Sequence, residues 1–414
     1  MREEILLNLD NPRQLEKLYR DNKPSFKSAF NALYPQLGSN SLADFWYQRL
    51  NFDQEDLYWG TPGERVFVLV ASLLAALLAK LPELFSLNAE LFFQRNAAFI
   101  VFPILTAYFA WKNRLSLKNM GILAAVFLLT LVFINALPQN QTSDTFVLSC
   151  IHLPIWLWAF LGFAFGGGKL KNWENRLGFL RYNGDLVVMT ALLLLAGGLT
   201  TAITIGLFKL IGWQIEKFYF NYVVICGLAA VPIVGTFLTQ NQPGLVNKIS
   251  PLIANLFSPV VLVMLVVYLA ATVFSGKDLY HDREFLLLFN VLLIGVMALI
   301  FFSVAGTSSL SKNPAQILIL FLLSAVTLLV NGIALSAVLF RIAEWGITPN
   351  RAAVLGGNLL MLAHLIFVGI RLFGALTRKT DLSLVGKTMA VFLPIYSLWG
   401  GVVTFLFPLF FGFK

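Results

Sequence analysis

The chain has little charge, few histidines and cysteines, and few polar stretches beyond its first sixty residues. Of its 414 residues only 12% are charged and 58% are hydrophobic, with three histidines and two cysteines. A soluble domain carries roughly a quarter charged residues. Apolar runs of about twenty residues, the length that crosses a bilayer, recur along the chain. The composition excludes a soluble globular protein and predicts an all-α polytopic integral membrane protein.

Motifs of the common enzyme classes are also absent. The sequence has no H-E-x-x-H, no G-x-S-x-G and no C-x-x-C pair. The one cluster of histidine with acids, around His281, is interpreted as a solvated loop. Gly166–Gly168 with Lys169 and Lys171 lacks the spacing of a phosphate-binding loop and is interpreted as a flexible turn. We therefore expect no catalytic residue, no metal and no cofactor.

Acidic side chains are missing from the interiors of the apolar runs. All eleven acids after residue 65 are assigned to loops or to the ends of runs, Asp185 among them. Ion-coupled carriers commonly place a carboxylate inside the bilayer. The pattern disfavours such a carrier, but a carrier that uses backbone carbonyls and hydroxyls stays open.

Residues 1–62 are predicted to form a small helical cytosolic segment, and residues 63–414 a multi-span membrane domain. Helix-start signals predict three helices, which begin near Pro12, Pro24 and Ser41. Sixty residues make a marginal core alone. We therefore expect the aromatic side chains of residues 1–60 to dock on the membrane domain, with binding of a protein partner as the alternative.

About eleven spans, within a range of ten to twelve, are predicted after Val66. The second is short for a spanning helix and is predicted to be little tilted or re-entrant. The spans are 66–85, 97–111, 119–137, 145–166, 186–211, 219–239, 258–275, 285–306, 315–340, 352–376 and 388–411.

Basic residues are distributed unevenly among the loops between these spans. Loops 112–118, 138–144 and 167–185 carry three, zero and four of them. Basic loops mark the cytoplasmic side, so the N-terminus is predicted to be cytoplasmic and the C-terminus outside. Scattered loop charges of this kind favour membrane lipids as partners and disfavour nucleic acid.

A few polar side chains lie within the later spans. His152 precedes Pro154, which interrupts helical hydrogen bonding, and Asn331 and His364 lie in the middle of spans. An intramembrane polar residue is a candidate functional site. Its more frequent role is an interhelical hydrogen bond, which is the interpretation we favour for single Asn and His residues.

The densest cluster of charge in the second half is Arg341-Ile-Ala-Glu-Trp-Gly-Ile-Thr-Pro-Asn-Arg351. Gly346 is suited to end a helix, and Thr348 with Pro349 to begin the next. Arg341 and Glu344 share a helix face and are expected to pair.

Arg351 falls in the first turn of the next helix, where a cation is not favoured. This mismatch suggests an anionic partner, which is Glu344, a lipid headgroup or a ligand. The simpler interpretation is a turn between two membrane helices. We take the candidate site to comprise Arg341, Glu344, Trp345, Gly346, Thr348 and Arg351.

The same string resembles the R-I-x-x-(Y/W)-G-(L/I)-T-x-x-R motif of a group of bacterial polytopic membrane proteins known only as a domain of unknown function. Trp345 stands where Tyr is more usual in that group. The resemblance covers about a dozen residues and implies a bacterial inner-membrane protein. It implies no activity.

Three functions remain open. The first is a non-catalytic protein that organises, senses or assists other membrane components, which the lack of catalytic motifs favours. The second is a transporter or flippase of a small or lipidic anion, with Arg341, Arg351 and Arg371 as anion contacts. The third is a membrane-embedded lipid-modifying enzyme that uses the histidines.

Overall fold

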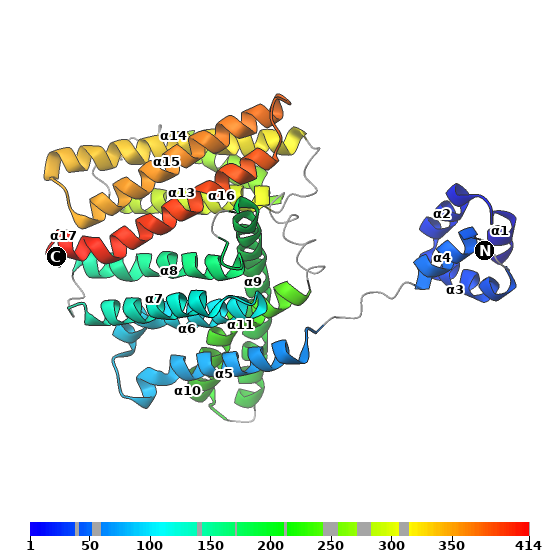
Figure 1. The fold of residues 1–414 in the computed structure, drawn as a ribbon, viewed down its shortest axis with the longest axis horizontal. Helices are drawn as coiled ribbons and strands as arrows, with labels where there is room; N and C mark the ends of the chain where they lie inside the picture. The colour runs from blue at the N-terminus through cyan, green and yellow to red at the C-terminus, as the bar shows by residue number, and fades with distance from the viewer. Residues whose placement is uncertain are drawn as a thin grey trace. The chain divides into compact units, whose positions relative to one another are not determined.

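The computed structural model describes residues 1–37, 41–51, 59–138, 143–169, 172–210, 213–242, 256–270, 283–305 and 314–413. The described residues form helices and turns and contain no strand. They divide into two compact units, Met1–Trp59 and Gly60–Lys414, close to the predicted boundary after residue 62. Figure 1 shows the helices of each unit. His281 and Lys171 lie outside the described residues.

The first unit contains the three predicted helices and one more. Asn11 and Asn22 accept hydrogen bonds from the backbone N–H groups of Gln14 and Ser25, and so cap the second and third helices. The short first helix carries none of the start signals used for the others. The helices are α1 (Arg2–Leu7), α2 (Pro12–Asp21), α3 (Lys23–Leu33) and α4 (Ser41–Asn51), with a 3₁₀ turn at Tyr34–Gln36.

This first unit has a hydrophobic core of its own. Phe26, Phe30 and Trp46 are almost fully buried, and the Phe26 and Trp46 ring centroids lie 5.2 Å apart. The Arg49 guanidinium covers the Trp46 ring at 4.6 Å. Most of the aromatic side chains expected to dock elsewhere are therefore used inside the unit, although Phe45 is exposed.

In the second unit, each predicted span coincides with an apolar helix, so the chain is an all-α multi-pass membrane protein. Nine of the described helical segments are long enough to cross a membrane. Leu256–Ala270 and α13 (Arg283–Ala305) supply shorter apolar stretches. The long segments are α5 (Pro62–Leu84), α6 (Ala89–Lys112), α7 (Leu117–Ala136), α8 (Asp144–Phe165), α9 (Trp173–Leu210), α10 and α11 (Glu216–Phe218 and Ile225–Asn241, joined by a π-helical turn at Tyr219–Val224), α14 (Pro314–Trp345), α15 (Pro349–Leu376), and α16 and α17 (Ser383–Gly401 and Phe407–Phe410, joined by a π-helical turn at Val402–Leu406).

The prediction that the second span is short was wrong. α6 begins at Ala89 because the Asn88 side chain caps it. Its first two turns hold polar side chains that bond to the end of α7. Arg95 donates through Nη1 and Nη2 to the carbonyls of Asn135 and Leu137 at 2.8 and 3.0 Å, while its buried Nε has no partner among the described residues. A membrane helix can include polar residues that have partners inside the protein. A prediction from hydropathy alone leaves such residues out and makes the helix too short.

The predicted loop 167–185 is also mostly wrong, because α9 already begins at Trp173. A helix of 38 residues is roughly 57 Å long, well beyond the ~30 Å hydrocarbon core of a bilayer. Its polar first turns carry Arg176 and Arg181. Asp185, assigned to a loop end from the sequence, lies within this helix and is buried.

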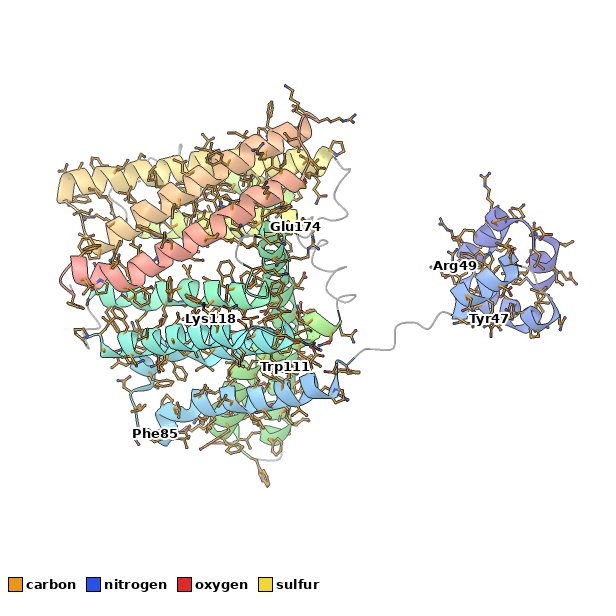
Figure 2. The ribbon with its side chains drawn as sticks, viewed as in Figure 1. Tyr47, Arg49, Phe85, Trp111, Lys118 and Glu174 are labelled. Atoms are coloured by element: carbon orange, nitrogen blue, oxygen red, sulfur yellow. The ribbon has the colours of Figure 1, made fainter. Side chains whose placement is uncertain are left out.

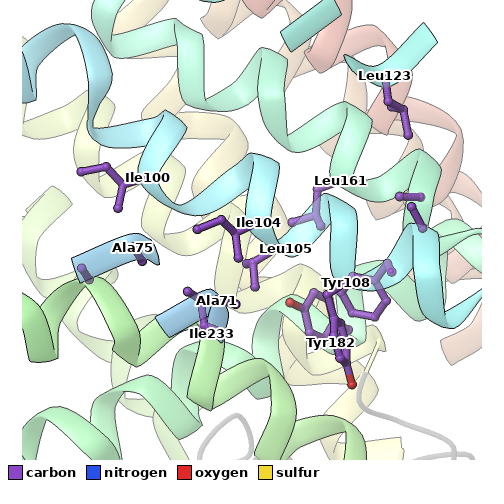
Figure 3. Close-up of a cluster of buried hydrophobic side chains, with 14 of the residues drawn as sticks. Ala71, Ala75, Ile100, Ile104, Leu105, Tyr108, Leu123, Leu161, Tyr182 and Ile233 are labelled. Carbon is purple, nitrogen blue, oxygen red and sulfur yellow. The ribbon is translucent and has the colours of Figure 1, made fainter. Parts of the chain in front are cut away.

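Side chains of six helices, α5, α6, α7, α8, α9 and α11, meet in one core. Ala71 and Ala75 of α5, Ile104 of α6 and Ile233 of α11 are buried together with Tyr182 of α9 (Figure 3). Small residues on α5 allow its neighbours to approach closely. A second core joins the carboxyl-terminal helices α13, α14, α15 and α16.

The membrane unit has two ends. At the Gly60 end, Lys112 at the end of α6 pairs with Glu64 at the start of α5, with an N–O distance of 3.0 Å. At the Phe413 end, the Ser143 hydroxyl before α8 donates to the Phe413 carbonyl at 3.0 Å. Trp111 and Glu174 lie toward the first end and Phe85 toward the second (Figure 2).

Most described basic residues of the membrane unit gather at the Gly60 end, in the loops and first turns between α6 and α7, α8 and α9, and α15 and α16. The start of α15 packs at the Phe413 end, where Ala353 clusters with Leu148 and Phe407. The Arg341–Arg351 turn and the C-terminal residues are thus at the end opposite the most basic loops, in the relative arrangement that the loop charges predict.

Candidate functional site

The turn between α14 and α15 has the predicted local structure. α14 ends at Trp345, and Gly346 has a φ of +76°, a conformation that glycine adopts without strain. The Thr348 side chain accepts from the backbone N–H of Arg351 at 3.3 Å, and Pro349 occupies the first helical position. The motif therefore encodes a tight reversal of the chain.

The chain itself supplies the partner of Arg351. Its Nη1 donates to the carbonyl oxygens of Trp345 and Gly346 at 3.1 and 2.7 Å. Free carbonyls at a helix C-terminus carry partial negative charge, so a guanidinium is favourable there. Arg341 and Arg351 each lie 5.6 Å from the Trp345 ring centroid, and Glu344 is exposed. The position of Arg351 is explained without a ligand.

The three arginines suggested as anion contacts do not all come together. Arg371 is on the same helix as Arg351 but toward its other end, roughly 30 Å away along the axis. Arg371 is exposed at the Gly60 end. A single small anion therefore cannot contact both Arg351 and Arg371.

The polar residues inside the spans mostly make interhelical or local hydrogen bonds. His152 pairs through Nδ1 with the Leu148 carbonyl at 2.9 Å. Asn331, fully buried on α14, donates to the Asn358 carbonyl of α15 at 3.1 Å. His364 of α15 pairs with the Tyr396 hydroxyl of α16 at 3.1 Å. The last two contacts join helices of the carboxyl-terminal bundle, whereas that of His152 lies within α8.

Several atoms in that bundle have no hydrogen-bond partner among the described residues: Asn331 Oδ1, Asn358 Nδ2, His364 Nε2 and Trp399 Nε1. The His364 ring stacks on Phe392 with centroids 4.1 Å apart. We assign these residues to helix packing.

The cavity that stands out lies elsewhere, between α8, the first turns of α9, and α16. It has a volume of about 340 Å³, within the range of small-molecule sites. Pro394 and Leu398 on its rim are exposed, so it opens at the surface of the bundle. Its lining comprises Trp156, Trp158, Ala159, Gly162, Phe163, Gly166, Lys169, Asn175, Arg176, Phe179, Leu393, Pro394, Ser397 and Leu398.

One end of the cavity is cationic. Lys169 follows the end of α8, and Arg176 stands in the first turn of α9. The Nε of Arg176 is shielded from solvent and has no hydrogen-bond partner among the described residues. Asn175 donates to the Gly166 carbonyl at 3.1 Å and so ties the start of α9 to the end of α8. An unpaired buried donor of a charged group is costly, so this end favours an incoming acceptor.

The rest of the cavity is walled by aromatic rings. The Trp158 indole N–H donates to Asn183 at 2.9 Å, and that of Trp156 donates to Thr130 at 3.3 Å. These bonds satisfy the polar edges of both rings and leave apolar faces for the cavity. Gly162 is required here, because a Cβ at this position would lie 2.9 Å from the Phe179 ring.

From Gly166 to Trp156, the cavity follows α8 for roughly 15 Å, about half of a ~30 Å hydrocarbon core. It therefore spans about one leaflet, with cations at the Gly60 end and apolar walls toward the middle. The sequence contained the signal in Lys169 and Arg176. It was missed because residues 167–185 were read as a loop.

Comparison of the chain with known protein families, characterised proteins and solved structures finds no match. The resemblance of the Arg341–Arg351 motif to a bacterial membrane protein group stays a prediction.

Proposed function

We propose that the protein binds an amphiphile in the cavity between α8, α9 and α16 and handles it as a lipid transporter or flippase. The cavity carries this proposal: it is polar at one end, apolar along one leaflet, and open at the bundle surface. A water-soluble substrate would not need four aromatic walls. A purely apolar ligand would leave the cationic end without a partner.

Two further observations support a site that changes shape. Pro394 of α16 lies in the cavity wall and cannot complete the helical hydrogen-bond ladder. The π-helical turn Val402–Leu406 interrupts the same span two turns later. Prolines and π-helical turns are frequent where membrane helices bend for function. We place the Gly60 end on the cytoplasmic side of a bacterial inner membrane, on the basis of its basic loops.

Filling the cavity tests this function. In Ala159→Phe a ring occupies the space between α8 and α16, whereas Ala125→Phe adds the same ring to an exposed position on α7. Each protein is reconstituted in liposomes with a fluorescent phospholipid, and dithionite quenching follows its movement between leaflets. We expect movement with the wild type and Ala125→Phe, and little with Ala159→Phe. Equal movement in protein-free liposomes would reject transport.

A second candidate is the organising or sensing role, with residues 1–60 binding a protein partner. The observation that favours it is the self-contained core of Met1–Trp59, which makes this unit a module in its own right. Affinity capture with the full chain and with a chain lacking residues 1–59 tests it. A stoichiometric partner that depends on those residues supports this role, and the same partners with both chains reject it.

A further inference from the structure

We propose that the cavity selects amphiphiles whose headgroup is an oxyanion, a phosphate or a carboxylate, and that carries no cationic group. This inference rests on the proposed function and deepens it by naming the substrate class. The proposed function requires only that the site binds lipids. The present inference adds that the site rejects zwitterionic lipids.

The charge of the lining is the first argument. Lys169 and Arg176 contribute two positive charges, and no Asp or Glu is among the described residues that line the cavity. A bound oxyanion is attracted by both cations. An ammonium on the same headgroup would be repelled by them and would find no carboxylate.

Aromatic faces could in principle hold an ammonium by cation–π attraction. The nearest indole of α8 in the lining, Trp158, lies roughly 12 Å along the helix from Gly166 at the cationic end. That is farther than the few bonds between phosphate and ammonium in a zwitterionic headgroup. The indoles are therefore placed for the hydrocarbon part of the ligand. The Phe163 and Phe179 rings lie nearer the cationic end, where the charges of Lys169 and Arg176 oppose an ammonium.

The geometry of Arg176 is the second argument. A guanidinium offers parallel N–H groups that match two oxygens of one phosphate or carboxylate. The Nε of Arg176 is buried and unpartnered, so an oxyanion must enter the cavity to reach it. Arg176 also lies in the first turn of α9, where free backbone N–H groups favour an anion.

The other polar side chains near this end already form hydrogen bonds within the protein, so they do not compete with a ligand for Arg176. Asn175 is bonded to Gly166, and the Ser397 hydroxyl to the Leu393 carbonyl at 3.0 Å. Among the described residues, neither cation of the cavity forms an ion pair. The fork of Arg176 is thus available for an oxyanion.

The test is native mass spectrometry of the full chain in mild detergent, titrated with defined lipids. Phosphatidic acid and phosphatidylglycerol present a phosphate, oleate presents a carboxylate, and phosphatidylethanolamine presents phosphate with an ammonium. We expect the wild type to bind at least one of the three anionic lipids about tenfold or more tightly than phosphatidylethanolamine. Which of them binds best separates a phosphate from a carboxylate source.

The variants are Arg176→Gln, Arg176→Lys and, as a control, Lys387→Gln, which removes an exposed charge of α16 at the same end. We expect Arg176→Gln to lose the preference, Arg176→Lys to keep part of it, and Lys387→Gln to keep all of it. A melting temperature of Arg176→Gln equal to that of the wild type, measured without added lipid, shows that the variant is folded. If Arg176→Gln does not fold, Arg176→Lys is compared with the wild type instead.

Equal binding of phosphatidylethanolamine by the wild type, or full preference in Arg176→Gln, would overturn the inference. If lipids bind without headgroup preference and Ala159→Phe blocks them, only the substrate class is wrong. If no lipid binds in a manner sensitive to Ala159→Phe, the proposed function itself fails.

Discussion

Arg351 and Arg176 occupy equivalent positions in two parts of the membrane unit, and their surroundings differ. Each stands in the first turn of a long helix, where a cation meets the positive end of the helix dipole. Arg351 folds back on two carbonyls at the end of the preceding helix. Arg176 faces a cavity and has a buried Nε without a partner among the described residues.

The difference shows how to separate a structural cation from a binding one in a membrane protein. The sequence places the same electrostatic mismatch at both positions. Where the carbonyl groups at the end of a preceding helix bond to the arginine, the mismatch is resolved and the arginine stabilises a turn. Where the chain supplies no such bond, the same side chain is available to a ligand.

The largest effect on stability should come from Arg351→Met. The substitution removes two charge-assisted hydrogen bonds and leaves the last carbonyls of α14 exposed to water. We expect a loss of about 2 kcal/mol, reduced from the buried value because the site is partly exposed. Thermal unfolding in a fixed detergent measures it, with Lys118→Met as a surface control; no loss beyond that of the control would remove the distinction between the two arginines.

Arg176→Met should act in the opposite direction in lipid-free protein. It replaces a partly buried guanidinium that has an unsatisfied Nε by an apolar chain of similar length. We expect unfolding to be unchanged or harder by up to about 1 kcal/mol. The variant should also lose the rise in melting temperature that an anionic lipid gives the wild type. A large drop in melting temperature of the lipid-free variant would mean that Arg176 is structural too.

Trp345→Leu should have a smaller effect than Arg351→Met. The indole ring lies beneath both Arg341 and Arg351, and cation–π contacts at exposed sites contribute roughly 0.5–1 kcal/mol. Leucine keeps apolar contact and removes the ring. A double-mutant cycle with Arg351→Met isolates the coupling between Trp345 and Arg351; a coupling near zero would leave the carbonyl contacts as the whole role of this arginine.

The smallest expected effect on stability concerns the first unit, where Arg20 and Arg49 pair with the Glu16 carboxylate at the solvent-exposed surface. The hydrogen bond from Arg20 and the charge of Arg49 hold the pKa of Glu16 below its ordinary value. A lowered folded-state pKa gives stability that is present above the unfolded-state pKa and lost as the pH falls through the folded-state value. Glu16→Gln should therefore weaken the first unit slightly at pH 7 and not at all well below pH 4.

Urea unfolding of a fragment of residues 1–59, followed by circular dichroism, measures this difference. Lys17→Gln, next along α2, serves as the control for a change in the charge of the surface. A Glu16→Gln effect that is the same at both pH values would show that the pair with Arg20 and Arg49 does not stabilise the unit.

The sequence was sufficient for features that depend on local chemistry. Gly346, Thr348 and Pro349 predicted the turn, and Pro12 and Pro24 predicted helix starts that the structure confirms. The positions of the apolar helices followed from apolar length, although only nine of the described helical segments are long enough to cross a membrane. Each of these signals acts within a few residues along the chain.

Features that depend on distant partners could not be predicted. The polar first turns of α6 fit within the bundle because Arg95 bonds to carbonyls at the end of α7, whereas a hydropathy profile registers only the charge of Arg95. The partners of Arg351 are two backbone carbonyl oxygens. Every residue has such an oxygen, so the residue types of the sequence do not predict this contact. The cavity requires α8, α9 and α16 to be packed together, so Lys169 and Arg176 looked like ordinary loop charges.

The completeness of the first core has a consequence for synthesis. Among the described residues of Met1–Trp59, all the buried hydrophobic side chains lie at or before residue 50, ahead of the first span, which begins at Pro62. At 5–20 residues per second, a ribosome needs roughly 2 to 7 s to extend the chain from there to the end of that span. Small helical domains fold in microseconds to milliseconds. The first unit can thus finish folding before a hydrophobic span emerges to compete for its aromatic side chains.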